Sequence, residues 1–287
     1  MSLEINGIGL TVNRATIYEV EALRDVSFAL HKGEITGLIG HSGSGKSSLL
    51  QIIAGLQPPT SGTVSLEGMP LYTEQTDRRR LRQQVGISFQ YPEHQFFEDS
   101  VEKELCFGLH RQGLESADIK SRIAEVMSLF GLDESLLPRS PFDLSGGQMR
   151  RLGLAITFAL HPTYLLLDEP LAGLDPKGRK EVMSAITSYA RRAEAMILFV
   201  SHNMDDVARI ADRLLVLREG QLILDGSTQD VFLEEETLRS AGLDLPEVFR
   251  LVADLRARGV PLADRFVVDV DDALQVLCDA YARRRDR

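Results

Sequence analysis

The sequence contains few of the residues and runs that mark disulfide-rich, membrane-spanning or exported proteins. Its 287 residues include no tryptophan and two cysteines, Cys106 and Cys278, which are far apart and form no CxxC pair. We interpret them as single thiols packed in helices of a reduced cytosolic protein, with a core large enough to need no disulfides. No apolar run approaches the roughly 18 residues of a membrane-spanning helix, and the first residues do not have the pattern of a signal peptide. A role at a membrane would therefore require other chains to cross it.

The sequence also lacks a basic surplus and internal repeats. The formal net charge is −10, whereas a general nucleic-acid binder needs a basic face for the phosphates. Hydrophobic residues make up 44% and charged residues 26% of the chain, which is the balance of a soluble globular protein. We expect no nucleic-acid partner, and one large domain with a small appendage.

Short apolar segments alternate with amphipathic ones over most of the chain. Strands are predicted at residues 3–12, 22–30, 35–39, 63–66, 164–168 and 197–201. A helix is predicted at residues 47–54, and helical periodicity dominates residues 101–160. This alternation predicts an α/β fold, with a mixed, mostly parallel sheet that helices cover on both faces.

The tail, from about residue 226, predicts a small helical appendage. One amphipathic helix would end at Gly259, and its apolar face would consist of Leu245, Val248, Leu251, Val252 and Leu255. The apolar face of a second helix would consist of Val270, Leu274, Leu277 and Tyr281. The pattern leaves open whether these faces pack on the same chain or on another one.

A glycine-rich loop follows the predicted strand 35–39 and opens a helix. Residues 40–47, read as Gly40-His41-Ser42-Gly43-Ser44-Gly45-Lys46-Ser47, fit the pattern GxxxxGK[ST] in full. Glycines let backbone N–H groups surround phosphate oxygens, and the helix N-terminus adds a partial positive charge. Lys46 would reach the β- and γ-phosphates and Ser47 would bind Mg²⁺. The sequence therefore predicts a nucleotide site here rather than a plain strand–turn–helix corner.

Acidic residues end another apolar strand. Asp168 and Glu169 follow Leu165-Leu-Leu167. Placed beside Ser47, Asp168 would hold Mg²⁺ and Glu169 would polarise a water for attack on the γ-phosphate. Taken alone, an acid pair after a strand is more typical of a helix cap. Together with the predicted phosphate loop, it favours a catalytic role.

Further polar residues follow strands or open helices. Leu144-Ser-Gly-Gly-Gln148 precedes a helix, where it would form a second anion-binding loop, although Ser145 would also serve as an ordinary N-cap. Gln90 offers an amide oxygen to a metal ion or water, His202 an imidazole, and Asp175 lies in a predicted turn. Each signal is weak singly, and their order and spacing together are highly specific.

In this order the motifs resemble those of the ABC ATPases over about residues 3–235, a P-loop NTPase fold. The resemblance implies ATP and Mg²⁺ as cofactors. It implies catalytic roles for Lys46, Gln90, Glu169 and His202, and Mg²⁺ ligands Ser47, Gln90 and Asp168. The nucleotide-binding residues implied on the same chain are Gly40, His41, Ser42, Gly43, Ser44, Gly45, Lys46, Ser47 and Ser48, with Tyr18 as the candidate to stack on adenine. The residues implied to bind ATP held by a partner are Ser145, Gly146, Gly147, Gln148 and Asp175. One copy of each motif implies that two ATPases, identical or related, face each other head to tail.

The segment that begins at Gln90 resembles one subgroup of this family more specifically. Gln90-Tyr-Pro-Glu-His-Gln-Phe-Phe97 is similar to the ATPases of energy-coupling factor (ECF) transporters, which import vitamins and transition-metal ions, and more so to the second of their two paired ATPases. This implies an integral T-type scaffold, a substrate-binding S-component and a peripheral place on the cytoplasmic face of the cell membrane. A groove lined by Tyr91, Phe96, Phe97 and Leu105 would receive a helix of the membrane partner.

The resemblance also implies a division of the chain into domains. An ATPase domain would comprise residues 1–235, with a helical and signature subdomain at about 91–157, and an extension at 236–287 would serve ATPase–ATPase contact.

Other classes fit the sequence less well. An ordinary ABC importer for amino acids or metals stays the main alternative. Exporters usually fuse membrane spans to the ATPase, translation-associated relatives carry two ATPase halves, and DNA-repair or chromosome ATPases carry long coiled coils. None of these features is present here. The transported substrate cannot be read from an ATPase that only powers the cycle.

Overall fold

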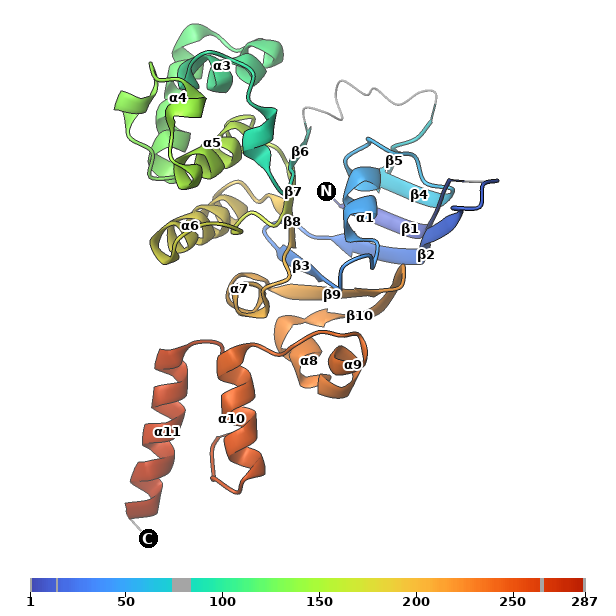
Figure 1. The fold of residues 1–287 in the computed structure, drawn as a ribbon, viewed down its shortest axis with the longest axis vertical. Coiled ribbons are helices and arrows are strands. Elements are labelled where there is room, and N and C mark those ends of the chain that lie inside the picture. Colours follow the sequence, from blue (N-terminus) through green and yellow to red (C-terminus); the bar gives the residue numbers. More distant parts are fainter. Residues whose placement is uncertain (1, 14, 74–83, 264–265, 286–287) are drawn as a thin grey trace.

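The computed structural model describes residues 2–13, 15–73, 84–263 and 266–285 (Figure 1). The strands are β1 (Leu3–Val12), β2 (Val20–Leu30), β3 (Ile35–Ile39), β4 (Ser61–Leu66), β5 (Met69–Pro70), β6 (Val85–Ser88), β7 (Tyr164–Asp168), β8 (Met196–Val200), β9 (Arg213–Arg218) and β10 (Gln221–Ser227). The helices are α1 (Lys46–Ile53), α3 (Val101–Gln112), α4 (Ser116–Leu129), α5 (Gly146–Ala159), α6 (Pro176–Arg192), α7 (Met204–Ile210), α8 (Thr228–Leu233), α9 (Glu235–Ser240), α10 (Glu247–Ala257) and α11 (Val270–Arg285). Short 3₁₀ helices are η1 (Pro92–Gln95), η2 (Glu134–Leu136) and η3 (Pro141–Asp143). The predicted α/β class is confirmed.

The strands form two sheets rather than the single sheet that the sequence predicts. The larger has the order β10-β9-β3-β8-β7-β6, in which all neighbours are parallel except β10, which pairs antiparallel with β9 at one edge. The smaller sheet, β2-β1-β4-β5, is antiparallel. Helix α1 packs in one core with strands of both sheets, so the loop that precedes α1 lies at their junction (Figure 1).

Strand β7 shows why its sequence is an unbroken apolar run. Leu165 and Leu167 are buried on one face, against the helices α3 to α6. Tyr164 and Leu166 are buried on the other face, against α1 and the smaller sheet. A parallel strand with both faces covered has no solvent side for polar residues. The first polar position, Asp168, therefore lies where the strand leaves the core.

Helices α3, α4 and α5 form a helical subdomain beyond the β6–β7 edge of the sheet (Figure 1). An aromatic chain joins it to α6. Phe130 and Phe158 meet edge to face with ring centroids 4.9 Å apart, and Phe158 meets Tyr189 at 4.8 Å. Such pairs add to the burial of the rings themselves, so the subdomain is anchored firmly to the body that carries β7.

The buried residues of the C-terminal part fall into two groups. Leu238, Leu243, Leu245 and Phe249 are buried in the same core as the helices that cover the sheet. Only the later residues form a small separate cluster, which is centred on Val252, Val267, Ala273 and Val276. Helices α10 and α11 extend side by side from the body (Figure 1). Within the described residues, no helix combines the length and the apolar character needed to cross a membrane.

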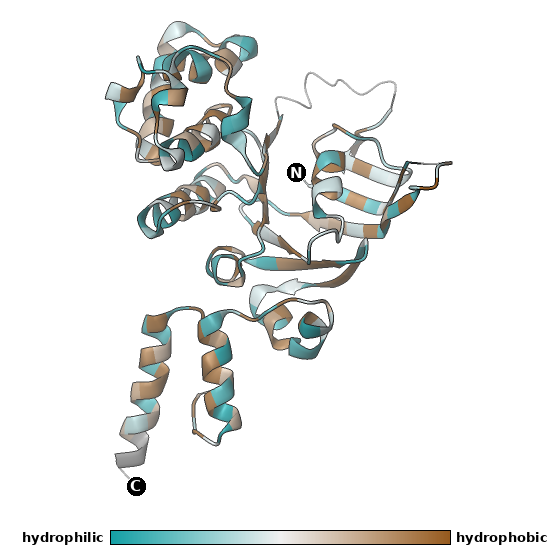
Figure 2. Ribbon diagram, viewed as in Figure 1, coloured by the Kyte–Doolittle hydropathy of each residue, from teal (hydrophilic) through white to brown (hydrophobic). Residues whose placement is uncertain are grey.

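The apolar face predicted for α11 is not the one that packs. Ala273 and Val276 are buried in one cluster with Val252 of α10, and Ala280, one turn further on, is also buried. Val270, Leu274 and Tyr281 are 59%, 52% and 67% exposed. On α10, Leu251 is likewise exposed whereas Val252 is buried. In Figure 2 apolar colour recurs along both helices, and part of it faces solvent.

Candidate functional site

The loop between β3 and α1 is shaped by glycines that no other residue could replace. A Cβ on Gly40 would lie 2.3 Å from the carbonyl oxygen of Leu217. Gly45 has φ +107°, and a Cβ there would lie 2.7 Å from the carbonyl oxygen of Ala22. Gly45 also caps α1 without any side-chain hydrogen bond, and the first turn of α1 carries no acid. The N–H groups at this helix end are therefore available to an anion.

Lys46 is the first residue of α1, and its side chain folds back over the loop. Its Nζ donates to the carbonyl oxygens of Gly40, at 2.6 Å, and His41, at 3.0 Å. Burial lowers the pKa of Lys46, and the charges of Glu169 and Asp168 act in the opposite direction. A partly desolvated ammonium group that carbonyl oxygens hold is well placed to bind a stronger anion.

Asp168 and Glu169 leave β7 facing this loop. Burial raises the pKa of Asp168, the negative charge of Glu169 adds to the rise, and Lys46 and Arg150 oppose it. Glu169 is 8% exposed and has φ +52°, which is unusual for a residue with a Cβ. Its N–H donates to Val200 O at 2.9 Å. The strained turn points the carboxylate of Glu169 into the space in front of the loop.

His202 joins the site from the end of β8. Its Nδ1 lies 2.7 Å from Oε1 of Glu169, and the Ser201 hydroxyl donates to Oε2 of Glu169 at 3.4 Å. The imidazole is largely exposed, whereas the carboxylate it meets is buried. This arrangement orients a carboxylate while leaving one side of the imidazole free for a ligand.

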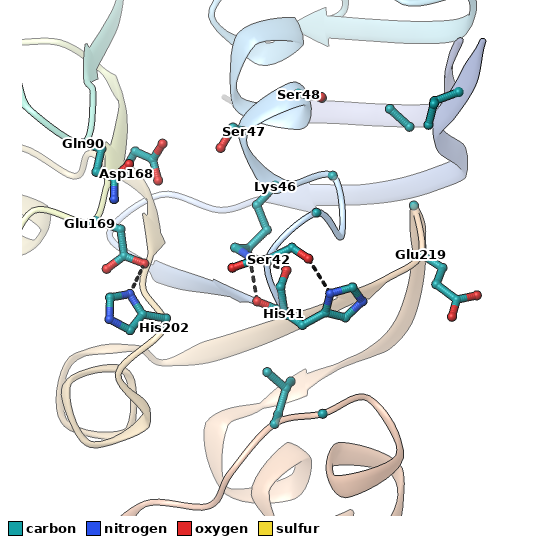
Figure 3. A pocket seen from close by; sticks show the side chains of 18 of the residues that line it. His41, Ser42, Lys46, Ser47, Ser48, Gln90, Asp168, Glu169, His202 and Glu219 are labelled. Carbon is teal, nitrogen blue, oxygen red and sulfur yellow. Dashed lines mark hydrogen bonds and ion pairs between the residues drawn. The ribbon is translucent and has the colours of Figure 1, made fainter. Parts of the chain in front are cut away.

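A cavity of about 840 Å³ brings the predicted residues together. It is lined by Gly40, His41, Ser42, Gly43, Gly45, Lys46, Ser47, Ser48, Gln90, Asp168, Glu169 and His202, with further residues from β2, β9–β10 and the C-terminal part. Figure 3 shows Gln90, Asp168, Glu169 and His202 on one side, and Lys46, Ser47 and the loop on the other. The size and the mixed lining suit a ligand as large as a nucleotide.

Some predicted residues do not line this cavity. Tyr18 is 70% exposed and lies outside the lining, to which Val20 and Ala22 contribute from the same part of the chain. Ser44 is fully buried, and its hydroxyl has no hydrogen-bond partner among the described residues. Its backbone N–H donates to the carbonyl oxygen of His41 at 3.2 Å.

The second predicted anion loop lies apart from the cavity. Ser145 caps α5: its hydroxyl accepts from Gln148 N at 3.3 Å, and its own N–H donates to Gln148 Oε1 at 2.9 Å. The N-cap interpretation of Ser145 is thus correct as far as the single chain goes. Ser145 and Gly146 are exposed. Asp175 is also a cap, accepting from Gly178 N at 2.9 Å.

The groove predicted beside Gln90 is wrong in part. Phe96 and Leu105 are buried in the hydrophobic core that also contains residues of α4 and α5, so neither is available to line a groove. Tyr91 and Phe97 are 52% and 61% exposed. Phe97 rests edge to face on Phe107 at 4.7 Å. The exposed surface therefore consists of two aromatic residues rather than four apolar ones.

Sequence reasoning missed part of the lining. Glu219 and Gly220, in the β9–β10 turn, and Gly242, Leu243 and Asp244, after α9, border the cavity. Gly220 approaches β2 closely, since a Cβ there would lie 2.7 Å from Ala22 O. The sequence shows a glycine at this position but not the strand that it approaches. The start of the C-terminal part reaches the cavity through tertiary packing, and a local sequence pattern cannot predict such a contact.

Comparisons with known proteins agree with this geometry. The model of the family described as ABC transporter matches residues 23–172. The energy-coupling factor transporter ATP-binding protein EcfA2 of Caldanaerobacter subterraneus subsp. tengcongensis is 40% identical over 262 residues, covering 91% of this chain and 92% of that protein.

Two solved structures extend the comparison. CbiO1 of Clostridium perfringens, part of the ABC transporter complex cbiONQ, matches with a TM-score of 0.74 and 31% identity over 88% of this chain and 98% of that one. A dimeric post-hydrolysis state of the ATP-binding cassette MJ0796, bound to ADP and Pi, matches with a TM-score of 0.69 and 25% identity over 79% of this chain and 98% of that one. The chain accordingly belongs to the ABC transporter family, among the energy-coupling factor transporter ATP-binding proteins.

Proposed function

We propose that this chain is the ATP-hydrolysing subunit of an ECF-type transporter that imports a micronutrient, either a vitamin or a transition-metal ion. The observation that carries the proposal is the pair of Glu169 and His202, 2.7 Å apart, across one cavity from Lys46 and its glycine loop. A phosphate-binding loop that faces a buried, oriented carboxylate is what hydrolysis of a phosphoanhydride requires.

The loop and Lys46 bind the phosphates of ATP. Backbone N–H groups of residues 40–48 and the start of α1 surround the phosphate oxygens. Lys46 exchanges the carbonyl oxygens of Gly40 and His41 for the β- and γ-phosphates. Since those carbonyls already orient Nζ, little side-chain entropy remains to be lost on binding.

Ser47, Gln90 and Asp168 would hold Mg²⁺. A hydroxyl, an amide and a carboxylate are oxygen donors of the kind that this ion prefers. The pKa of Asp168 is raised by its burial, so its carboxylate gains from a nearby cation. Within the described residues, no cluster of three or more His, Cys, Asp or Glu side chains could hold a metal, which suits an ion held largely by phosphate and water. When bound, Mg²⁺ neutralises charge that develops on the phosphates.

Glu169 orients the attacking water and accepts its proton. His202 holds the carboxylate in place and presents its free side toward the γ-phosphate. Water attacks the γ-phosphorus, the bond to the bridging oxygen breaks, and ADP leaves with phosphate.

Ser145, Gly146, Gly147, Gln148 and Asp175 serve ATP on a second ATPase, identical or related. The exposure of Ser145 and Gly146, and their absence from the lining of the cavity, support this role. The dimeric state of a similar cassette also supports it. The complete ATP site thus forms between two chains.

The complex would include a T-type membrane scaffold and S-components that bind the imported substrate. Support comes from the relatives' names and from exposed Tyr91 and Phe97 beside Gln90, where a membrane partner would dock. The chain would then lie on the cytoplasmic face of the cell membrane as a peripheral subunit.

The extension at 236–287 would contribute to the ATPase–ATPase contact. Exposed Leu251, Val270, Leu274 and Tyr281 give α10 and α11 an apolar surface that their own packing leaves uncovered. The amide of Glu247, at the start of α10, donates to Asp205 of α7 at 3.0 Å. This ties the helix pair to the segment that follows His202.

Affinity purification from detergent-solubilised native membranes tests the proposal. We expect a second, similar ATPase, one membrane scaffold and several small membrane proteins, which would name the substrates. Two copies of this chain with a dedicated permease pair and a solute-binding protein would instead identify an ordinary importer.

A further inference from the structure

Arg150, two positions after Gln148, is a buried cation inside the helical subdomain. It is 4% exposed, although α5 begins in an exposed loop. Its Nη2 donates to the backbone carbonyl oxygen of Glu169 at 2.6 Å. A buried charge persists only when its partners compensate for lost hydration, so the surroundings of Arg150 indicate what it does.

The carbonyl that Arg150 binds belongs to a residue in an unfavourable conformation. Glu169 has φ +52°, and its N–H is already committed to Val200 O at 2.9 Å. A side chain in the left-handed region costs free energy that neighbouring contacts must offset. The carbonyl of Val200 and the guanidinium of Arg150 therefore fix the two peptide groups that flank Cα of Glu169, from which the catalytic carboxylate projects.

The other side of Arg150 meets the segment after Gln90. Its Nη1 lies 3.5 Å from Oε2 of Glu93, and its guanidinium lies over the ring of Tyr91, 5.6 Å from the centroid. One turn further along α5, Gly153 gives room to Pro92, since a Cβ on Gly153 would lie 2.6 Å from the Cβ of Pro92. Tyr91, Pro92 and Glu93 thus rest on one face of α5.

We propose that Arg150 is a positioning residue that couples residues 91–93 to the backbone of Glu169. The inference rests on the proposed function, because it assigns Arg150 to the control of the residue that activates water. A planar guanidinium reaches Glu93 and the Glu169 carbonyl at once, which the single ammonium of a lysine cannot do. Any displacement of residues 91–93 is carried to Glu169 through one buried side chain that contacts both.

The test uses the assembled complex and measures kcat, KM for ATP and ATP affinity. Arg150→Gln should lower kcat roughly tenfold, because the Glu169 carbonyl loses its charged donor, and leave KM and ATP affinity within about twofold. Arg150→Lys should restore part of kcat. Glu93→Gln, which leaves the guanidinium in the fold, should lower kcat by a smaller factor. The matched control is Arg122→Gln, since Arg122 also donates to a backbone carbonyl of α5, that of Ala159 at 3.1 Å, outside the cavity.

A merely structural role is separated by a double variant. If Arg150 acts through Glu169, Arg150→Gln should reduce kcat no further when Glu169 is already Gln. An additive loss, a rise in KM at unchanged kcat, or a loss equal to that of Arg122→Gln would overturn the proposal. A wild-type complex without ATPase activity would overturn the proposed function instead. If Arg150→Gln fails to fold, Glu93→Gln alone decides, and an unchanged kcat there counts against the coupling.

Discussion

The imidazole of His202 and the carboxylate of Glu169 form a hydrogen bond of 2.7 Å that joins the ends of β8 and β7. Glu169 directly follows the buried strand β7, and His202 follows the buried strand β8 after one intervening residue. The two strands are parallel neighbours, and Asp168 pairs with Val200. The sheet therefore fixes the distance between the two side chains before any ligand is bound. In the catalytic role proposed for this pair, its geometry need not be created during the reaction.

Replacing Glu169 by Gln should nearly stop turnover and leave ATP binding intact. The amide keeps the shape and the hydrogen bond to His202 but cannot accept a proton from water, so kcat should fall by about 10²–10⁴-fold. Single-turnover hydrolysis and ATP titration measure the two effects. Glu125→Gln is the matched control, because Glu125 also pairs with a histidine, His161, at 3.2 Å outside the cavity. An unchanged rate in Glu169→Gln would remove this residue from catalysis.

Replacing Lys46 by Ala should weaken ATP binding itself. The variant loses the cation that the loop carbonyls orient toward the phosphates, and a charged hydrogen bond of this kind contributes about 1.5–3 kcal/mol, or more than tenfold in Kd. A titration with fluorescent ATP analogue measures it. Lys32→Ala, which removes a lysine paired with Glu194 at 3.0 Å, should bind like wild type. Tight binding by Lys46→Ala would contradict the assignment of the loop.

The sequence predicts the cavity better than it predicts the surfaces. Gly40, Lys46 and Asp168 follow strands whose order fixes their positions, because parallel strands end at one edge of a sheet. Phe96 and Leu274 show the limit. An apolar residue in a loop or on a helix can be placed in the core only if its packing partner is known. The burial of Phe96 and the exposure of Leu274 depend on neighbours far along the chain. The contacts of Arg150 could not be predicted for the same reason, since they join Glu93 and Glu169, which are far apart in the sequence.

The stability of the ligand-free chain should depend on the charge of Asp168. Burial and Glu169 raise the pKa of Asp168 above 3.8 in the folded state. Between 3.8 and the raised pKa the folded chain binds more protons than the unfolded chain, so this group lowers stability as the pH rises through that interval. Asp168→Asn should therefore be more stable than wild type at pH 7 in EDTA, and the difference should shrink as the pH falls toward 3.8.

Thermal or urea unfolding at several pH values measures this difference. Asp254→Asn, an exposed acid on α10, is the control and should show no comparable gain. Lower stability of Asp168→Asn at neutral pH would mean that attraction to Lys46 outweighs the desolvation of the carboxylate.

A large cation placed at Ser145 should disable the ATP site of the partner. Ser145→Arg fills an exposed loop without entering the core, so the chain should fold and still bind ATP in its own cavity. Turnover at the composite site whose phosphate loop belongs to the partner should be lost. Ser116→Arg, at the exposed start of α4, is the control. Intact turnover with Ser145→Arg would contradict a head-to-tail dimer.

A charge on the exposed face of α11 should weaken association of the ATPases. Leu274 is 52% exposed, and helical spacing places it on the same side of α11 as the exposed Val270 and Tyr281, away from the buried Ala273 and Val276. Leu274→Glu leaves the packed face of the helix untouched, so the fold should survive. If the extension forms the contact, a buried carboxylate there costs several kcal/mol, and the dimer should dissociate at concentrations where wild type stays associated.

Sedimentation velocity over a range of concentrations measures the effect, with ATPase activity as a second readout. Gln275→Glu adds the same charge at the next, already polar and exposed position and should not change association. Because the two variants differ in the position of the charge and not in its sign, a loss of dimer in both would indicate general repulsion between acidic chains. Association unchanged in Leu274→Glu would place the ATPase–ATPase contact in the nucleotide sites alone, and the apolar surface of α11 would then belong to another subunit.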